Sequence, residues 1–335
     1  MSFDDDGSPS RAVLEQMHCW EPEDGVPGRH AMTAFCRRVR LEQAWWRESN
    51  GHPIGTQPIR PIHDRPVRSV GSRLPLDYAR QTGANFLTDA ARSAAHARTL
   101  RVETHQTLDR QRVWADLLSS LALAINLFGD LADDLDAADA ALHKWLPGTP
   151  GRVRDVRFAY SPGRLDPTYL NSLRMFDTAF LLGLDDGTSG IVAVSVKYRE
   201  ANKAETPRPE NDRRYRAVAA QARVFQSGAI DELARRGDLC TMWLEHLLVH
   251  AMVQHPSKEW RWGRYIVLHH PDNSDIVDAS NRYRKMLADH TTFTATSIDR
   301  LIDSAVLPTT AASAIEARYR FGTTNSATST PGLAD

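Results

Sequence analysis

Apolar and polar residues alternate at helical spacing through the first part of the chain. This spacing predicts helices over four segments: 30–49, 88–102, 111–128 and 129–145. Asn50-Gly51 is a typical helix stop, and Thr88 is a suitable N-cap for the second helix. The acids of the last helix, Asp130 among them, are expected in its first turns, where they suit the helix dipole. A solvated acidic face is the simplest interpretation of these acids.

After residue 151 the spacing becomes that of strands. Val156, Phe158 and Tyr160 are expected on one side of a first strand, and two further strands are expected at residues 175–184 and 190–198. The sequence Asp185-Asp186-Gly187 between these two predicts a hairpin turn. The remaining predicted elements are helices near 213–226, 240–255 and 280–287 and a strand at 265–269. This order predicts an α/β fold in which a mixed sheet is flanked by helices.

Three segments lack a regular pattern. Residues 1–29 are expected to form a disordered or irregular tail, and residues 306–335 the end of a helix and a second disordered tail. Residues 53–75 are rich in proline and arginine, so the region 30–75 is predicted to be a helix followed by an extended arm. The arm could lie along a phosphate backbone or wrap over the protein surface. Residues 76–305 are then the main domain, with the first helix and arm as an N-terminal helical extension.

Composition narrows the class of protein. A chain of 335 residues with 41% hydrophobic content can bury a large core. No apolar run is as long as a membrane span, and the start MSFDDDGSPS is acidic where a secretory signal is basic and then apolar, so we expect a cytoplasmic protein without a membrane partner. The three cysteines do not suggest a disulfide framework, and a net charge of −1 gives no global sign of nucleic-acid binding.

One acid and one amine interrupt the predicted hairpin. Asp177 lies in the first of its strands and Lys197 at the end of the second, although charged groups are seldom buried without a partner. Alternation places Lys197 on one face with Ile191, Ala193 and Ser195. If the chain folds back at the turn, Asp177 lies opposite Ser195 or Val196, which makes the acid and the amine neighbours.

Two interpretations of this pair remain open. A divalent cation needs oxygen ligands, and a nearby amine can orient the attacking water and neutralise charge on phosphorus, so the pair suits metal-dependent phosphodiester hydrolysis. A structural salt bridge at the end of the sheet explains the same two residues.

Several segments together resemble a known family. The chain resembles the PD-(D/E)XK nuclease superfamily, and more closely a bacterial branch of restriction endonuclease-like proteins, from about residue 35 to about residue 301. The resemblance rests on RRVRLEQAWWRESNGHPIG (37–55), GSRL (71–74), ANFLT (84–88), LLSSLALAINLFGDL (117–131), FAYSPGR (158–164), FDTAFLL (176–182), VSVKYRE (194–200) and WLEHLL (243–248). It implies a restriction endonuclease-like core and a DNA endonuclease that uses Mg²⁺ or Mn²⁺ in a restriction or defence setting.

The same resemblance implies the roles of individual residues. Asp177 matches the metal-binding aspartate and Lys197 the catalytic lysine. The chain departs from the family pattern at Ser195, where a glutamate is usual, and at Ala159, where a glutamate also follows the phenylalanine of the first strand. Leu121 stands where a glutamine is typical. Loss of carboxylates weakens metal binding. The alternative is therefore that the chain has a degenerate nuclease fold and binds nucleic acid or a partner protein without cleaving it.

Other carboxylates and arginines complete the set of candidates. Glu200, three residues past Lys197, is a candidate catalytic and metal-binding acid, and Asp130 a further candidate metal ligand. The candidate DNA contacts are Arg164, Arg213 and Arg214. Whether the protein forms a homodimer or needs a defence-system partner protein is left open.

One further pair of residues has metal-binding spacing. His246 and His250 lie one helical turn apart, which suits zinc, although no third ligand is evident and simple packing explains them equally.

Overall fold

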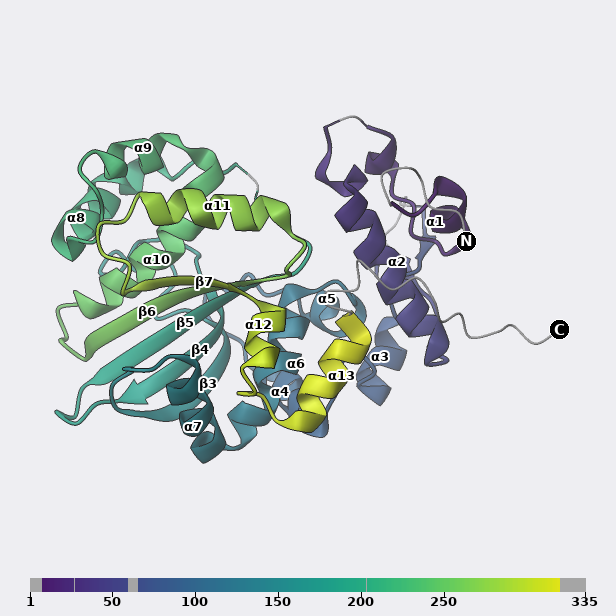
Figure 1. Cartoon of the computed structure of the whole chain (residues 1–335), viewed down its shortest axis with the longest axis horizontal. Helices are drawn as coiled ribbons and strands as arrows, with labels where there is room; N and C mark the ends of the chain where they lie inside the picture. Colours follow the sequence, from purple (N-terminus) through teal and green to yellow (C-terminus); the bar gives the residue numbers. More distant parts are fainter. Residues whose placement is uncertain (1–7, 27, 60–65, 203, 320–335) are drawn as a thin grey trace.

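A five-stranded sheet with strand order β3-β4-β5-β6-β7 forms the centre of the protein (Figure 1). The computed structural model describes residues 8–26, 28–59, 66–202 and 204–319. The strands are β3 (Arg152–Tyr160), β4 (Phe176–Gly183), β5 (Ser189–Lys197), β6 (Trp260–His269) and β7 (Phe293–Ser297). The first three pair antiparallel and β5, β6 and β7 pair parallel. The predicted α/β class with a mixed sheet is confirmed.

One face of the sheet packs on helices that precede β3 and helices that follow β7 in the chain. These helices are α4 (Asp89–Leu100), α5 (Arg110–Ala115), α6 (Ser120–Asp133), α7 (Leu135–Trp145), α12 (Ile298–Asp303) and α13 (Thr309–Tyr319). Helix α6 is apolar on nearly every side, as expected of a helix buried all round. Gly129 lets α6 approach α4 closely, because a Cβ there would lie 2.5 Å from the Cα of Ala91.

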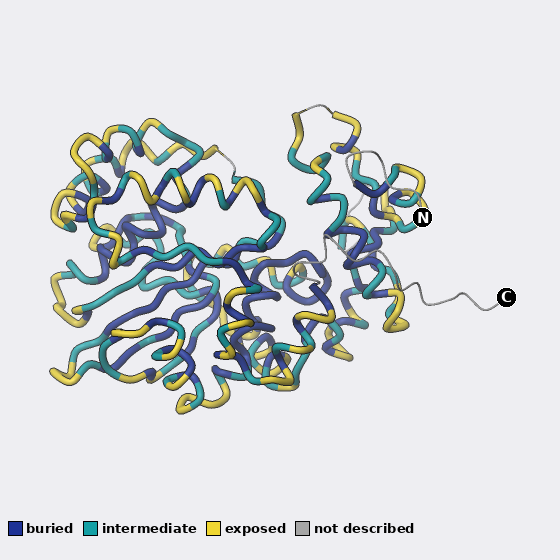
Figure 2. The backbone as a smooth tube through the Cα atoms, in the orientation of Figure 1, coloured by how far each residue is buried: buried dark blue, intermediate teal, exposed yellow. Residues whose placement is uncertain are grey.

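The opposite face of the sheet packs on a second helical layer. Its helices are α8 (Asp212–Ala222), α9 (Ala229–Arg235), α10 (Cys240–Val253) and α11 (Ser274–Lys285). The predicted alternation in β5 holds, because Val192 and Val194 belong to the α6 side of the core and Ile191 and Ala193 to the α10 side. Figure 2 shows the strands buried between the two layers.

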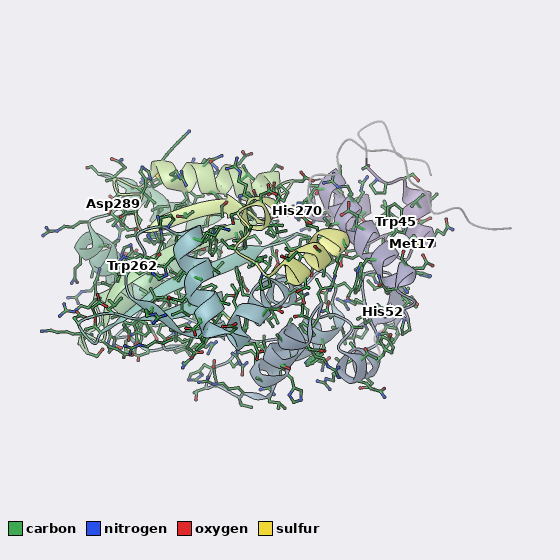
Figure 3. All side chains as sticks on the ribbon, turned by 60° about the horizontal axis from the view of Figure 1, so that its bottom comes forward. Met17, Trp45, His52, Trp262, His270 and Asp289 are labelled. Carbon is green, nitrogen blue, oxygen red and sulfur yellow. The ribbon has the colours of Figure 1, made fainter. Side chains whose placement is uncertain are left out.

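The elements within residues 8–26, 28–59 and 66–82, here called the N-terminal unit, lie beside the end of the sheet. Its elements are α1 (Arg11–Gln16), the short 3-10 helices Pro22–Gly25 and His30–Met32, α2 (Ala34–Ser49), β1 (Gly55–Gln57), β2 (Arg68–Val70) and α3 (Leu76–Thr82). Figure 3 shows Met17, Trp45 and His52 in this unit and His270 near its border with the sheet. The ring of His270 lies 5.0 Å from that of Phe35 on α2, so α2 packs directly against the end of β6.

The N-terminal segments are more ordered than their composition indicates. Within 8–29, α1 forms and Leu14 and Cys19 are buried, and Asp24 makes a buried ion pair with Arg40 at 2.6 Å. The proline- and arginine-rich segment is not wholly an extended arm, because Gly55–Gln57 and Arg68–Val70 pair as a two-stranded antiparallel sheet. The predicted tails at 1–7 and 320–335 and the middle of the arm at 60–65 lie outside the described residues.

Several local predictions differ from the structure. The helix predicted over 111–128 is interrupted, because α5 ends at Ala115 and α6 begins at Ser120. The helix predicted over 129–145 is two helices, because Asp134 ends α6 and caps α7 by accepting a hydrogen bond from the Ala137 N–H at 2.9 Å. Asp130 therefore lies near the C-terminus of α6, where a negative charge does not suit the helix dipole. In β3, the left-handed φ of Ala159 (48°) breaks the alternation, so Tyr160 packs on the α10 side while Phe158 packs on the α6 side.

A further difference concerns the C-terminal helices. The helix predicted at 280–287 begins earlier, as α11 (Ser274–Lys285), and α13 continues the packed structure to Tyr319. Arg318 of α13 is fully buried and donates hydrogen bonds to Asn85 Oδ1 at 2.7 Å and Gln43 Oε1 at 3.0 Å. Within the described ranges, none of the helices has both the length and the apolarity needed to cross a membrane.

Candidate active site

The hairpin of β4 and β5 brings Asp177 and Lys197 to the same end of the sheet. The turn at Gly187 (φ 81°) sets a register in which Thr178 pairs with Val194. Asp177 lies at the start of β4, and its Oδ2 accepts a hydrogen bond from the Val196 N–H at 2.8 Å. Lys197 ends β5, and its side chain is 16% exposed. The acid and the amine therefore lie at the same, partly solvent-accessible end of the sheet, on two of its inner strands.

A third charged residue comes from helix α10. Glu245 Oε2 accepts hydrogen bonds from Ser195 Oγ at 2.8 Å and from the Tyr265 hydroxyl at 2.6 Å. The same oxygen lies 3.9 Å from Lys197 Nζ. The sequence analysis did not assign Glu245 to the site. The sequence signals for it are its place in the segment WLEHLL (243–248), which is part of the family resemblance, and its position as a lone acid in a mostly apolar helix.

Burial and neighbouring charges set the protonation of these groups. Burial raises the pKa of Asp177 to about 7, although the charge of Lys197 and the hydrogen bond from Val196 oppose that rise. Burial alone would lower the pKa of Lys197, but the carboxylates of Glu245 and Asp177 outweigh it and raise that pKa above its usual value. Lys197 is therefore a stable ammonium cation, suited to charge neutralisation and hydrogen-bond donation.

Glu200 lies just beyond β5, and residues from three other parts of the chain form hydrogen bonds with it and with the residues before it. Ser120, at the start of α6, donates a hydrogen bond to Glu200 Oε1, and its Oγ also accepts from the Tyr198 N–H at 3.3 Å. Asn273 Nδ2 donates to the backbone carbonyl of Glu200 at 3.0 Å, and His30 Nε2 lies 2.9 Å from the carbonyl oxygen of Arg199. Glu200 Oε2 is buried and has no hydrogen-bond partner among the described residues. The charge of Glu200 acts on both Asp177 and Lys197.

Asp130 is not brought to this end of the sheet. Its Oδ2 accepts a hydrogen bond from Thr88 Oγ1 at 2.7 Å. It follows Ser120 by ten residues of α6, a distance of about 15 Å along the helix axis. Ala159, which stands where the family has a glutamate, is fully buried in the core on the α6 side and offers no carboxylate; its carbonyl oxygen accepts from Arg98 at 3.1 Å.

The three candidate DNA-contacting arginines have different surroundings. The Arg164 side chain is only 4% exposed and is paired with Glu103 at 2.6 Å. Arg214 donates to the backbone carbonyl of Tyr169 at 2.7 Å, whereas Arg213 is exposed. Arg164 and Arg214 hold backbone or side-chain partners in this structure, and of the three only Arg213 is an exposed residue.

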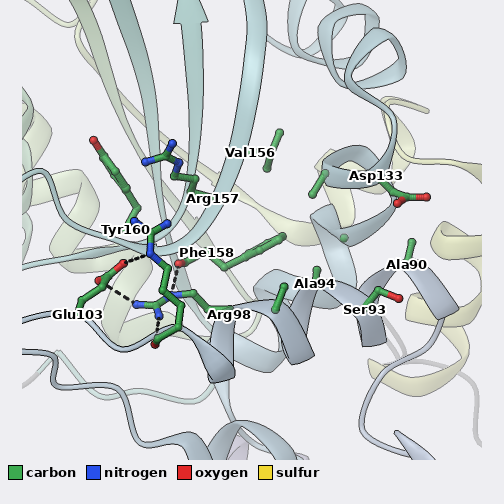
Figure 4. Close-up of a pocket in the computed structure, with 14 residues that line it drawn as sticks. Ala90, Ser93, Ala94, Arg98, Glu103, Asp133, Val156, Arg157, Phe158 and Tyr160 are labelled. Carbon is green, nitrogen blue, oxygen red and sulfur yellow. Dashed lines mark hydrogen bonds and ion pairs between the residues drawn. The ribbon is translucent and has the colours of Figure 1, made fainter.

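A cavity near Arg98 lies outside the Asp177 site. It has a volume of about 390 Å³, is open to solvent on one side and is lined by residues of α4, α6 and β3 (Figure 4). Arg98 crosses one end and donates to Glu103 Oε2 at 3.1 Å. Neither Asp177 nor Lys197 lines this cavity. A different cavity of about 400 Å³ opens at Lys197, Glu200, Glu205 and Thr241.

The histidine pair on α10 is part of the core. The Nε2 atoms of His246 and His250 are 3.1 Å apart, and His246 is also bonded to the Tyr283 hydroxyl at 2.9 Å. Burial lowers the pKa of both rings, that of His250 to about 4, so both are neutral at physiological pH. No third histidine, cysteine or acid joins them as a metal ligand in the described part of the chain.

The oxygen atoms at the end of the sheet suit a hard divalent cation. Asp177, Glu245 and Glu200 offer carboxylate oxygens, and the buried Glu200 Oε2 is left without a partner by the described residues. Over the described ranges, no three or more histidine, cysteine, aspartate or glutamate side chains form a ready metal cage. Mg²⁺ is usually held by one or two carboxylates together with waters and substrate phosphates, so this donor set fits it without such a cage.

Comparison with known proteins agrees with the fold. A family model described as PD-(D/E)XK nuclease superfamily matches residues 30–321. The chain belongs to this superfamily. No curated protein and no solved structure matches it. The match begins in the N-terminal unit and ends just after α13, so it includes the elements on both sides of the sheet.

Proposed function

We propose that this protein is a metal-dependent DNA endonuclease acting in a restriction or defence setting, with its active site at Asp177, Lys197 and Glu245. The observation that carries the proposal is the position of Glu245, whose Oε2 lies 2.8 Å from Ser195 Oγ and 3.9 Å from Lys197 Nζ. An acid from α10 thereby replaces the carboxylate that β5 lacks. A lysine between acids is the arrangement that phosphodiester hydrolysis needs.

Each residue has a distinct role in this proposal. Asp177 and Glu245, with Glu200 as a further candidate, would hold Mg²⁺ or Mn²⁺. When bound, that cation supplies charge stabilisation at the phosphate and activates a water nucleophile. Lys197 stays protonated, and its ammonium group donates a hydrogen bond to the attacking water or to a phosphate oxygen. Ser195 and Tyr265 orient Glu245 by donating to its Oε2.

A second function has its own support. Ala159 and Ser195 supply no carboxylate, and Asp177 is neutralised more easily than a solvated acid because burial raises its pKa to about 7. A protein that binds nucleic acid or a partner protein without cleaving it is consistent with these features.

Plasmid nicking separates the two functions. The parent protein, incubated with supercoiled plasmid and Mg²⁺ or Mn²⁺, is expected to nick or linearise it, and Lys197→Ala is expected to be inactive. Lys285→Ala is the matched control, because Lys285 is exposed on α11. If neither the parent nor the control cuts plasmid with either metal, while both still bind DNA, the binding function replaces the nuclease.

A further inference from the structure

An arginine beside the candidate active site is occupied by an acid from a loop. Arg174 precedes Asp177 by three residues, and its side chain is 16% exposed. Its Nη2 lies 2.5 Å from Glu205 Oε2, and its Nη1 donates to Thr241 Oγ1 at 3.5 Å. Thr241 Oγ1 in turn donates to Glu205 Oε2 at 3.1 Å. The Glu205 carboxylate is therefore held by the two side chains that lie between α10 and the start of β4.

Arg174 is electrostatically part of the site. Its positive charge opposes the protonation of Lys197, and the negative charge of Glu245 stabilises its own guanidinium. Because the two cations repel each other, each needs an anion nearby. Asp177 and Glu245 stabilise the ammonium of Lys197, and Glu205 pairs with the guanidinium of Arg174.

Glu205 also lies between two cavities. The cavity at Lys197 and a second one of about 260 Å³, lined by Arg174, Arg208 and Tyr215, share Glu205 as a lining residue. If the Glu205 side chain moved away from Arg174, the guanidinium of Arg174 would be accessible from both cavities. An extended anionic chain running from Lys197 past Arg174 to the exposed Arg208 would meet three cations in succession.

The contact is of a kind that a phosphate can replace. The Glu205 side chain is 47% exposed, far more than that of Arg174, and its neighbours Ala204 and Thr206 are exposed and lie outside any helix or strand. Ion pairs with such an exposed partner contribute little to stability. A guanidinium binds phosphate with charge-assisted, bidentate hydrogen bonds, which are among the stronger polar contacts in proteins.

We propose that Arg174 is a phosphate-binding residue for a nucleic-acid strand at the Lys197 cavity, and that Glu205 occupies its guanidinium until the strand displaces it. Glu205 thus acts as an internal competitor for the substrate. The inference rests on the proposed function only in taking nucleic acid as the ligand, since it does not require cleavage.

Binding measured without cleavage tests this inference. Fluorescence anisotropy of a labelled single-stranded oligonucleotide and of its duplex, with EDTA present, reports affinity for the full chain and its variants. Glu205→Gln keeps the side-chain shape and removes the competing charge, so it is expected to tighten binding about three- to tenfold. Arg174→Ala is expected to weaken binding about tenfold and to reduce the salt dependence by about one phosphate contact.

A charge-matched control separates this effect from a change in net charge. Asp231 pairs with Arg216 at 2.5 Å in another exposed ion pair, and Asp231→Asn also removes one negative charge. The double variant Arg174→Ala with Glu205→Gln is expected to bind no better than Arg174→Ala alone. Thermal melting verifies that each variant is folded.

Three results would overturn the proposal. The Glu205→Gln protein binds the oligonucleotide no tighter than Asp231→Asn, or Glu205→Gln still tightens binding when Arg174 is alanine. The third is that the Glu205→Gln protein binds neither the single strand nor the duplex. Failure of the nuclease function gives a different pattern, with no plasmid nicking but the same changes in anisotropy.

Discussion

Glu245 Oε2 accepts a hydrogen bond from Ser195 Oγ at 2.8 Å, and this contact joins helix α10 to the strand that carries Lys197. A short serine at this position leaves room for a carboxylate that comes from another element. The structure therefore contains an acid in contact with residue 195, although the sequence there reads serine. The following predictions depend on this arrangement and on the groups around it.

Removal of the Glu245 charge is expected to abolish cleavage. Glu245→Gln keeps the side-chain size and an acceptor for Ser195 and Tyr265, but it removes a proposed ligand and one of the anions that stabilise the Lys197 ammonium. We expect the plasmid-nicking rate to fall about 100-fold or more, as for the loss of a major electrostatic contact. Glu210→Gln, an exposed residue, is the control and should cut at the parent rate. A Glu245→Gln protein as active as this control would remove Glu245 from the site.

Metal affinity is expected to depend on pH through Asp177. Because burial raises the pKa of Asp177 to about 7, a cation must displace a proton from this acid in more acidic solution. Affinity for Mn²⁺ measured by calorimetry should rise about tenfold per pH unit below about 7 and level off above it. Asp185→Asn, in the exposed hairpin turn, should behave like the parent. A flat profile from about pH 5 to about pH 8 would contradict the role of Asp177 as a ligand.

The same ionisation predicts a pH-dependent difference in stability. The pKa of Asp177 is about 7 in the folded protein, against about 3.9 for an unfolded aspartate. The folded chain therefore holds this proton more tightly, and the resulting stability is fully present below about pH 4 and is lost as pH rises through about 7. The Asp177→Asn protein does not lose this stability as pH rises. The melting temperature of Asp177→Asn minus that of the parent should therefore increase between about pH 5 and about pH 7 and then stay constant. A constant difference over that range would show that the pKa is not raised.

Ser120 is expected to position Glu200. Its hydroxyl donates to Glu200 Oε1 and accepts from the Tyr198 N–H, so Ser120→Ala frees the glutamate and leaves that N–H without this partner. We expect Mn²⁺ affinity to fall about tenfold, within the range known for residues that orient metal ligands. Ser93→Ala, exposed on α4, is the control. If Glu200→Gln leaves both affinity and nicking unchanged, Glu200 is a structural residue and not a ligand.

The last helix is expected to be essential for stability. Arg318 is fully buried, donates to the backbone carbonyl of Asn85 at 2.8 Å, and lies 4.2 Å from the ring centre of Trp46. Arg318→Ala leaves several buried acceptors unpaired, so it should lower the free energy of unfolding by about 3 kcal/mol or more. Urea denaturation, with the exposed Glu316→Ala as control, measures this effect. An unchanged midpoint would mean that α13 is not needed for the fold.

Local patterns in the sequence were sufficient for most of the sheet. The alternation in residues 190–198 and the Asp185-Asp186-Gly187 turn predicted the hairpin, the faces of β5 and the position of Asp177 opposite Ser195 or Val196, because pairing in a hairpin follows directly from the turn and from strand periodicity. The N-cap Thr88 and helix α10 were also predicted, because capping residues and helical periodicity are local signals too. Where a single residue alters the backbone, as Ala159 and Asp134 do, the periodic pattern was misleading.

Contacts between distant segments were decided by the tertiary structure alone. Glu245 lies 50 residues from Ser195 along the chain, and Glu205 lies 31 residues from Arg174. No local pattern encodes such contacts, since they depend on how α10 and the loop after β5 pack against the sheet. The sequence by itself determined the two strands and the acid and amine they carry. The packing of helices on those strands determined which other charges reach them, because charges separated along the chain interact only when the fold brings them within a few ångströms.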